Sequence, residues 1–208
     1  MKQAEKMQAE DRRVQIISRS TDLFLEQGFA GTSMSMIAKR CGITKASLYH
    51  HFNGKDELFV ACVTSGYQRA LDALTEIIAQ ADRPAGQKLA EAMTVLYDIT
   101  ISSSVGRMSP LIAEVSRTFP NVARSFHSEY IAPQQDLVWN LIEAGQASGE
   151  FKDLDRGLLF HMLFGPIVTL SLSREMFSTF DDLDEHFPVG HLRDGHLNVI
   201  LGMLRKDR

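Results

Sequence analysis

Cysteine is scarce in this chain of 208 residues, which contains only Cys41 and Cys62. Two cysteines have neither the number nor the spacing of a disulfide framework or of a four-cysteine zinc site. We therefore expect both to be small, buried apolar residues. Enzyme motifs are also missing, because the sequence has no glycine-rich phosphate loop, no HExxH and no Gly-x-Ser-x-Gly. We expect neither an enzyme nor a cofactor or metal centre.

Long apolar runs are absent as well. The first residues alternate charge and polarity and offer no apolar stretch for a signal peptide. The longest segment without an acidic or basic residue, 157–173, contains a histidine, a proline and several hydroxyls, and it is shorter than the ~20 apolar residues that span a bilayer. We therefore expect a cytoplasmic protein with no membrane partner, in which residues 157–173 form a buried helix.

Acidic residues outnumber Lys and Arg by 26 to 22, so the net charge is −4. The excess is uneven along the chain. Between residues 28 and 55 there are four bases and two histidines but no acid: Lys39, Arg40, Lys45, His50, His51 and Lys55. One basic face on an acidic body suits a protein that meets phosphate at one end only. An ordinary solvated surface would have the same composition, so charge alone does not decide.

Apolar residues recur at helical spacing throughout, and no stretch has the strict alternation of a strand. The spacing predicts an all-α protein. Helices are expected at 12–27, 33–41, 44–49, 54–78, 87–103, 109–119, 121–131, 134–148, 155–172 and 191–205. Gly28 is a suitable residue to end the first helix, and residues 82–86 form the first plausible linker.

Residues 33–52 have the pattern of a helix-turn-helix. Ser33 and Thr44 can each cap a short helix, and Gly42 supplies the left-handed turn between them. Five apolar residues would face inward: Ile37, Ala38, Cys41, Ile43 and Leu48. Small or polar residues would lie on the outer face of the second helix, as DNA reading requires. An ordinary helical hairpin remains the alternative at this point.

The run from Arg12 to Phe59 resembles the N-terminal domain of the TetR/AcrR family of bacterial transcriptional regulators. The matching residues are Ile17, Phe24, Gly28 and Phe29 in the first helix, Ile37-Ala38 and Gly42-Ile43-Thr44 in the second helix and turn, and Leu48-Tyr49-His50-His51-Phe52 with Lys55-Asp56-Glu57-Leu58 after it. The sequence departs from the family at Ser20, Ser33, Met36 and Cys41. The resemblance covers roughly the first 60 residues.

The resemblance implies specific DNA contacts. It assigns Ser33, Tyr49, His50 and Lys55 to phosphate contacts, and Thr44, Lys45, Ala46 and Ser47 to the recognition helix and its start. It also implies a homodimer, a palindromic double-stranded DNA operator and a small-molecule effector that releases a repressor. The expected domains are a helix-turn-helix domain at 10–70 and a C-terminal ligand-binding and dimerisation bundle at 71–208.

Aromatic and methionine residues of the C-terminal half could line a ligand cavity or simply fill a core. We take as ligand candidates Met93, Tyr97, Phe126, Tyr130, Trp139 and His161. The helices at 134–148 and 155–172 carry apolar residues on more than one side, which suggests a two-fold interface. Its candidate residues are Leu141, Phe160, Phe164 and Ile167.

The segment 181–196 gathers acids and histidines, among them Asp181, Asp182, Asp184, Glu185, His186, His191 and His196. Their spacing fits no compact metal-ligand motif, so a solvated loop before the last helix is favoured. Two other classes of protein remain open. A helical small-molecule or metal-binding protein would not bind DNA, and a helical enzyme would need a catalytic pair that the sequence does not reveal.

Overall fold

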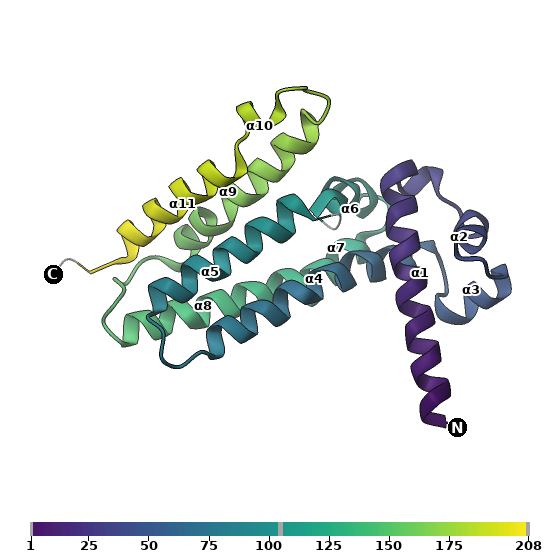
Figure 1. Ribbon diagram of the computed structural model, residues 1–208, viewed down its shortest axis with the longest axis horizontal. Helices are drawn as coiled ribbons and strands as arrows, with labels where there is room; N and C mark the ends of the chain where they lie inside the picture. Colours follow the sequence, from purple (N-terminus) through teal and green to yellow (C-terminus); the bar gives the residue numbers. More distant parts are fainter. Residues whose placement is uncertain (1, 104–105, 207–208) are drawn as a thin grey trace. The chain divides into compact units, whose positions relative to one another are not determined.

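The computed structural model describes residues 2–103 and 106–206, without the side chains of residues 2–9 and 109. Helices make up nearly all of this part of the chain, and it contains no strand beyond an isolated bridge between Phe151 and Arg205. The predicted all-α class is therefore confirmed. The chain forms two compact units (Figure 1). The first contains residues 1–67 and 108–129, and the second contains residues 68–107 and 130–208.

The first unit begins with three helices and the start of a fourth: α1 (Lys2–Gly31), α2 (Met34–Cys41), α3 (Lys45–His51) and α4 (Lys55–Ala79). Two short helices from later in the chain complete it, α6 (Ser109–Ser116) and α7 (Pro120–Phe126). Three aromatic rings form the centre of its core. Phe59 lies edge-on to Phe24 at 5.1 Å and to Phe29 at 5.2 Å between ring centroids, and all three side chains are buried.

The first helix is longer than its sequence pattern predicts. Gly28 does take a positive φ of 69°, as expected of a helix terminator, but the chain resumes a helical turn and ends at Gly31. The Thr32 hydroxyl donates to the Gly28 carbonyl at 2.7 Å and so satisfies an acceptor that the kink leaves free. The short helices start and end close to the positions that the sequence predicts.

The second unit contains the rest of α4 and four longer elements: α5 (Ala85–Tyr97), α8 (Ala132–Ala147), α9 (Arg156–Met176) and α11 (Val189–Leu204). Between α9 and α11 lies α10 (Leu183–His186), a single turn that the sequence pattern does not predict. Glu150 fixes the start of α5, because its carboxylate accepts from the N–H groups of Ala85 at 2.7 Å and Gly86 at 2.8 Å. A carboxylate at this end of a helix is also favoured by the helix dipole.

The last residues of two predicted helices form π-helical turns where an α-helix is expected. Residues predicted to close the helices at 87–103 and 121–131 form π-helical turns, η1 (Asp98–Ser102) and η3 (His127–Ile131). Each turn lies within a few residues of a place where the chain passes from one unit to the other. Wide turns of this kind are rare and occur frequently at functional positions.

The packing units also divide the chain differently from the two predicted domains. Residues 108–129 pack with the N-terminal helices, whereas the expected boundary places them in the C-terminal domain. The division of function between 10–70 and 71–208 stays a prediction.

Residues 157–173 do not form the buried helix that their composition predicts. They lie in α9, which among the described helices is the one long and apolar enough to cross a membrane, and 22% of its most apolar stretch is buried. Leu158, Val168 and Leu172 are each at least half exposed. The apolar surplus of α9 therefore lies on the surface of the single chain.

Candidate nucleic-acid interface

The turn between α2 and α3 is built from three local hydrogen-bond patterns. The Ser33 hydroxyl accepts from the Met36 N–H at 3.3 Å and so caps the start of α2. Gly42 ends α2 in the left-handed conformation, with φ 67° and ψ 33°. Its N–H donates to Lys39 at 3.2 Å, and the Ile43 N–H donates to Ala38 at 3.0 Å. This paired end motif reverses the chain within two residues, as the sequence predicts.

Helix α3 begins at a second cap, because the Thr44 hydroxyl accepts from the Ser47 N–H at 3.1 Å. Within α3 the one buried side chain is Leu48, which is fully buried. Lys45, Ala46, Tyr49 and His50 are exposed and Ser47 is half-buried. The helix therefore presents short and polar side chains on its outer face.

The two capping hydroxyls keep a donor for an external acceptor. Each hydroxyl of Ser33 and Thr44 accepts one backbone N–H, and its own proton is still available. Exposed donors of this kind at helix starts are typical phosphate contacts. Tyr49 is 45% exposed, and the Lys45 ammonium lies 5.9 Å from the centre of its ring, so a lysine and a phenol stand side by side at the surface.

Lys55 lies in a different environment from the other predicted phosphate contacts. Its ammonium donates to the carbonyls of Phe29 at 2.7 Å and Thr32 at 2.8 Å, and it lies 4.2 Å above the Phe29 ring. Burial lowers the pKa of Lys55. Two of its three hydrogens are thus used within the chain, and its first role in the structure is to hold the start of α4 against the end of α1. One N–H remains for a phosphate.

A comparison with protein families decides the identity of this unit. Residues 16–62, which include α2, the turn and α3, match the family described as bacterial regulatory proteins, tetR family. This segment of the chain is therefore of the TetR type. The resemblance read from its motifs is therefore confirmed.

Similar proteins agree with this assignment. An uncharacterised HTH-type transcriptional regulator of Mycobacterium tuberculosis is 31% identical over 106 residues, which is 50% of this chain and 53% of that protein. The chain thus spans about half the length of that relative. The HTH-type transcriptional repressor KstR2 of Rhodococcus jostii is 28% identical over 153 residues, 73% of this chain and 74% of the repressor.

A solved structure shares the fold of the whole chain. The transcriptional regulator FadR of Bacillus subtilis, in complex with stearoyl-CoA, superimposes with a TM-score of 0.76 at 20% identity. The match covers 91% of this chain and 98% of FadR. At this identity the likeness establishes the fold alone.

The structure places the six ligand candidates in different surroundings. Met93, Tyr97 and Tyr130 are buried in the second unit, whereas Phe126 belongs to the first unit, where its ring lies 5.3 Å from that of Tyr67. The remaining two lie nearer the surface: Trp139 donates to Glu143 at 2.6 Å, and His161 is exposed. All six stay predictions for a ligand site, and Met93, Tyr97 and Tyr130 are the ones buried in the second unit.

Tyr97 has a partner that its sequence context does not predict. Its hydroxyl lies 2.9 Å from Nδ1 of His196, and Nε2 of His196 lies 2.8 Å from the Met162 carbonyl. A carbonyl only accepts, so Nε2 carries the proton, and Nδ1 of the neutral ring accepts from the Tyr97 hydroxyl. Burial lowers the pKa of His196 and raises the pKa of Tyr97 to about 12. The pair joins α5, α9 and α11 inside the second unit.

Two of the four predicted dimer contacts lie in the interior of the single chain. Leu141 and Ile167 are 2% exposed and belong to the core of the chain itself, so they offer no surface to a second copy. Phe160 and Phe164 are half-buried, and Phe160 packs against Trp139 at 5.7 Å. The sequence pattern cannot separate the core face of an apolar helix from its outer face when both are apolar.

Exposed apolar side chains instead follow one face of α9 and one face of α11. We call this set the α9/α11 stripe: Leu158, Val168, Leu172, Met176, Leu192 and Val199, which are 41–67% exposed. A side chain added at Gly165, Gly195 or Gly202 would meet no atom within 4 Å. The predicted partner of α9 in the seam was the helix at 134–148, which is α8, but the exposed surface lies on α11.

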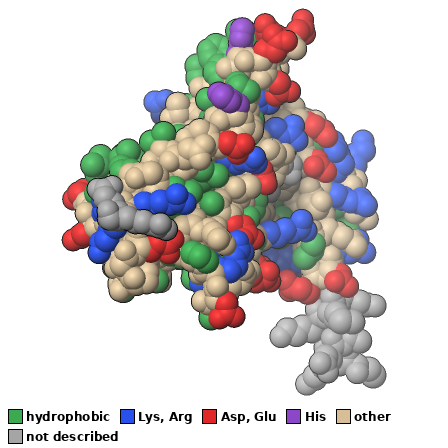
Figure 2. All heavy atoms as spheres, turned by 60° about the vertical axis from the view of Figure 1, so that its left-hand side comes forward, with side chains coloured by type: hydrophobic (Ala, Val, Ile, Leu, Met, Phe, Trp, Pro, Cys, Tyr) green, Lys and Arg blue, Asp and Glu red, His purple; other side chains and the backbone are tan. Residues whose placement is uncertain are grey.

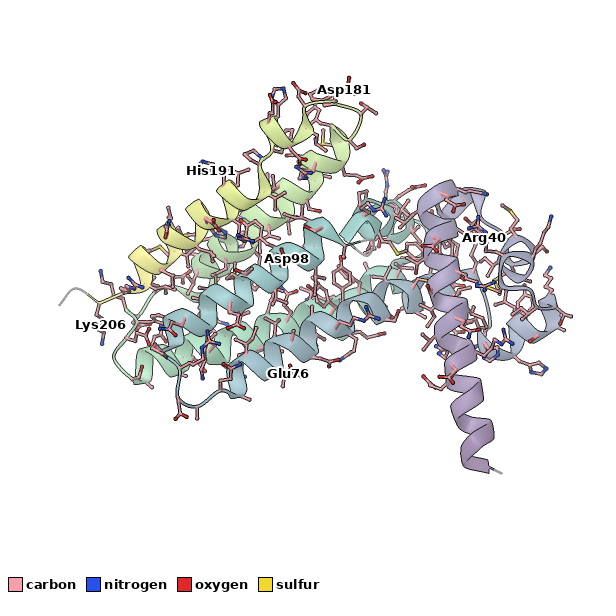
Figure 3. All side chains as sticks on the ribbon, in the orientation of Figure 1. Arg40, Glu76, Asp98, Asp181, His191 and Lys206 are labelled. Atoms are coloured by element: carbon pink, nitrogen blue, oxygen red, sulfur yellow. The ribbon has the colours of Figure 1, made fainter. Side chains whose placement is uncertain are left out.

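The acidic and histidine-rich segment does not converge on a point. Asp184 pairs with Arg174 at 2.7 Å, and the ring of His186 lies 3.5 Å from Asp182. Figure 2 shows acidic side chains and histidines at the surface near α10, at the top of the view. Figure 3 shows Asp181 in the loop before α10 and His191 apart from it on α11. In the described part of the chain, no three such residues are grouped to hold a metal.

Arg13 and Arg19 of α1 are functional candidates that the sequence pattern does not reveal. Arg13 donates to the His51 carbonyl at the end of α3 at 2.8 Å, and its guanidinium lies 4.2 Å from the centre of the Phe52 ring. Arg19 donates to the Arg40 carbonyl at the end of α2 at 2.9 Å. A sequence alone gives no means to distinguish such arginines from solvated ones.

Proposed function

We propose that the chain is a DNA-binding transcriptional regulator whose α3 reads the major groove. The observation that carries the proposal is the uncovered outer face of α3, on which Lys45, Ala46 and Ser47 follow a capped helix start. Short side chains let a helix backbone come close to base edges, and a lysine can reach the acceptors of guanine. A mere helical hairpin has no need for such a face.

Phosphate contacts around α3 would fix its register on the duplex. We assign them to Ser33, Thr44, Tyr49 and His50, which carry donors on exposed side chains. Lys55 joins them only through its third N–H, because its other two are used by carbonyls. The absence of acids from the sequence between residues 28 and 55 favours an anionic partner.

The regulator acts as a homodimer in this proposal. A palindromic operator offers two half-sites about 34–36 Å apart, or a multiple of that distance, and two copies of α3 must meet them together. The α9/α11 stripe supplies apolar surface on two neighbouring helices, which suits a self-complementary two-fold seam. Such a seam would cover the exposed apolar face of α9, and we expect the protein in the cytoplasm with its DNA.

The sign of regulation is proposed to be repression that a small molecule relieves. The similar protein KstR2 is a repressor, and FadR was solved with stearoyl-CoA. Such a molecule must bind the DNA-incompetent arrangement more tightly than the competent one, since equal affinity shifts nothing. Residues 108–129 suit the transmission of that difference, because the chain enters the first unit there and Phe119 packs against Phe29 at 5.5 Å.

Selection from a library of randomised 30-base-pair duplexes tests the proposal directly. We expect the full-length protein to enrich a palindromic sequence and to bind it with an affinity that falls steeply with salt. Failure to retain any duplex at low salt would instead favour the alternative, a helical small-molecule-binding protein that does not bind DNA.

A further inference from the structure

Two arginines of α1 donate hydrogen bonds to backbone carbonyls at the C-terminal ends of α2 and α3. The paired motif at the end of α2 uses the carbonyls of Ala38 and Lys39, which leaves the next carbonyl, that of Arg40, without a backbone partner. The Arg19 guanidinium takes that carbonyl at 2.9 Å. At the end of α3 the Arg13 guanidinium takes the carbonyl of His51 in the same way.

These contacts are stronger than ordinary surface hydrogen bonds. A cation at the C-terminal end of a helix interacts favourably with the helix dipole, and a charged donor makes a stronger bond than a neutral one. Arg13 adds a stacking contact, because its guanidinium lies over the ring of Phe52, which is 1% exposed. Its position is therefore fixed by two partners at once.

A second bond ties α2 back to α1. The Arg40 side chain donates to both carboxylate oxygens of Glu26, at 3.0 Å and 2.6 Å, on the face where α2 meets α1 (Figure 3). This pair lowers the pKa of Glu26 through the hydrogen bond. Arg40 thus bonds to α1 in two ways: its side chain donates to Glu26, and its carbonyl accepts from Arg19.

Helix α3 depends on such contacts more than α2 does. Four side chains of α2 are buried, whereas α3 buries Leu48 alone, followed by Phe52 just after its end. Leu48 and Phe52 lie on one line, so only partly buried side chains such as Ser47 oppose rotation of the helix about that line. The Arg13 bond to His51 lies at the end of this line and restrains the rotation that would turn Lys45 and Ser47 away from a groove.

We propose that Arg13 is a positioning residue for DNA recognition, which sets the orientation of α3 without touching DNA, and that Arg19 does the same for α2. The proposal rests on the proposed function, because it concerns how α3 is presented to a duplex. It goes beyond the contacts named above, since neither arginine is on the reading face.

The test uses the full-length protein and the duplex that the wild type selects from the randomised library. Arg13→Gln removes the charge and the strong donor, and Arg12→Gln is the matched control one residue away. Arg12 is exposed and bonds only to Gln15 of its own helix, at 3.3 Å, among the described contacts. Binding is measured by fluorescence anisotropy at several salt concentrations, well below the melting temperature of each variant.

We expect Arg13→Gln to weaken binding about tenfold, or about 1.4 kcal/mol, with no change in the slope of log affinity against log salt. The Arg12→Gln affinity should stay within about twofold of wild type. Arg13→Lys keeps a donor for the carbonyl and should recover part of the loss. Arg19→Gln should have a smaller effect than Arg13→Gln, because packing already fixes α2.

Three results would overturn the proposal. A slope flattened by about one unit would make Arg13 a phosphate contact instead. A lower melting temperature with unchanged affinity would make its role purely structural. Equal losses in Arg12→Gln and Arg13→Gln would make the effect one of net charge. If the wild type selects no duplex at all, the proposed function fails first, so the two failures are distinguishable.

Discussion

Neighbouring residues on α9 give a sharp test of the dimer seam. Val168 is 59% exposed and belongs to the α9/α11 stripe, whereas Ile167 is 2% exposed in the core. We expect Val168→Asp to produce a folded monomer and Ile167→Asp to unfold the second unit. Both variants introduce the same charge into the same helix, so helix propensity does not distinguish them.

The magnitudes follow from burial. Full burial of a valine contributes about 1.5–3 kcal/mol, and the exposed half of Val168 therefore stands to gain about 1 kcal/mol in a seam. Each Asp also loses at least ~1 kcal/mol on desolvation. Because two-fold symmetry presents the change twice, the dimer should weaken by about 4 kcal/mol, or about 1,000-fold in Kd. Ile167→Asp instead puts a carboxyl into the core at a cost of about 3–5 kcal/mol, a large part of typical stability.

Sedimentation velocity and circular dichroism on the same samples separate the two outcomes. Val168→Asp should sediment as a monomer at ~10 μM, retain its helical signal and lose operator binding. The seam on this face is refuted if that variant remains dimeric at ~10 μM. A monomeric wild type at the same concentration would contradict the symmetric operator as well.

Three other predictions concern the reading face, a helix start and the half-buried His196. Lys45→Ala should change the preferred base at one position of each half-site and weaken binding to the original base by about 1–3 kcal/mol. Repeated selection on randomised half-sites measures this, and an unaltered base preference would contradict it. Glu150→Gln keeps one acceptor for the two N–H groups that start α5, and should lower the free energy of unfolding by about 1–2 kcal/mol in thermal denaturation, with DNA affinity unchanged at 20 °C. Because burial lowers the pKa of His196, the unfolded chain binds a proton at this histidine more readily than the folded chain does. The free energy of unfolding should therefore be complete above about pH 6.5 and decrease as pH falls below it. Tyr97→Phe and His196→Phe should both reduce this pH dependence, and an unaltered pH profile in His196→Phe would exclude the Tyr97–His196 pair as its cause.

The local structure of the helix-turn-helix, α2 and α3, is predictable from sequence because its capping and turn signals act over a few neighbouring residues. A capping hydroxyl, a glycine in the turn and a few inward apolar residues act over three or four positions, and Ser33, Gly42 and Thr44 all adopt the roles that these signals predict. The family resemblance adds residue types that no spacing argument supplies. Those parts of the fold are confirmed.

Contacts between distant residues could not be predicted in the same way. The two hydrogen bonds of Lys55 reach back 26 and 23 residues, and its type and position suit a phosphate contact equally well. The sequence pattern does not identify the outer face of α9, because apolar residues lie on both sides of this helix and either side could pack against the core. Only the packing of the chain identifies Ile167 as interior and Val168 as surface.

The split first unit has a consequence for protein engineering. A graft of α1, α2, α3 and the start of α4 onto another regulator needs only one junction in the sequence. Here such a graft would leave behind residues 108–129, and with them the Phe119 ring that packs on Phe29 beside Lys55. A chimaera that carries both residues 1–67 and residues 108–129 retains the native contacts of the first unit. A chimaera with a single junction leaves the Phe29 ring without Phe119 and next to a foreign sequence.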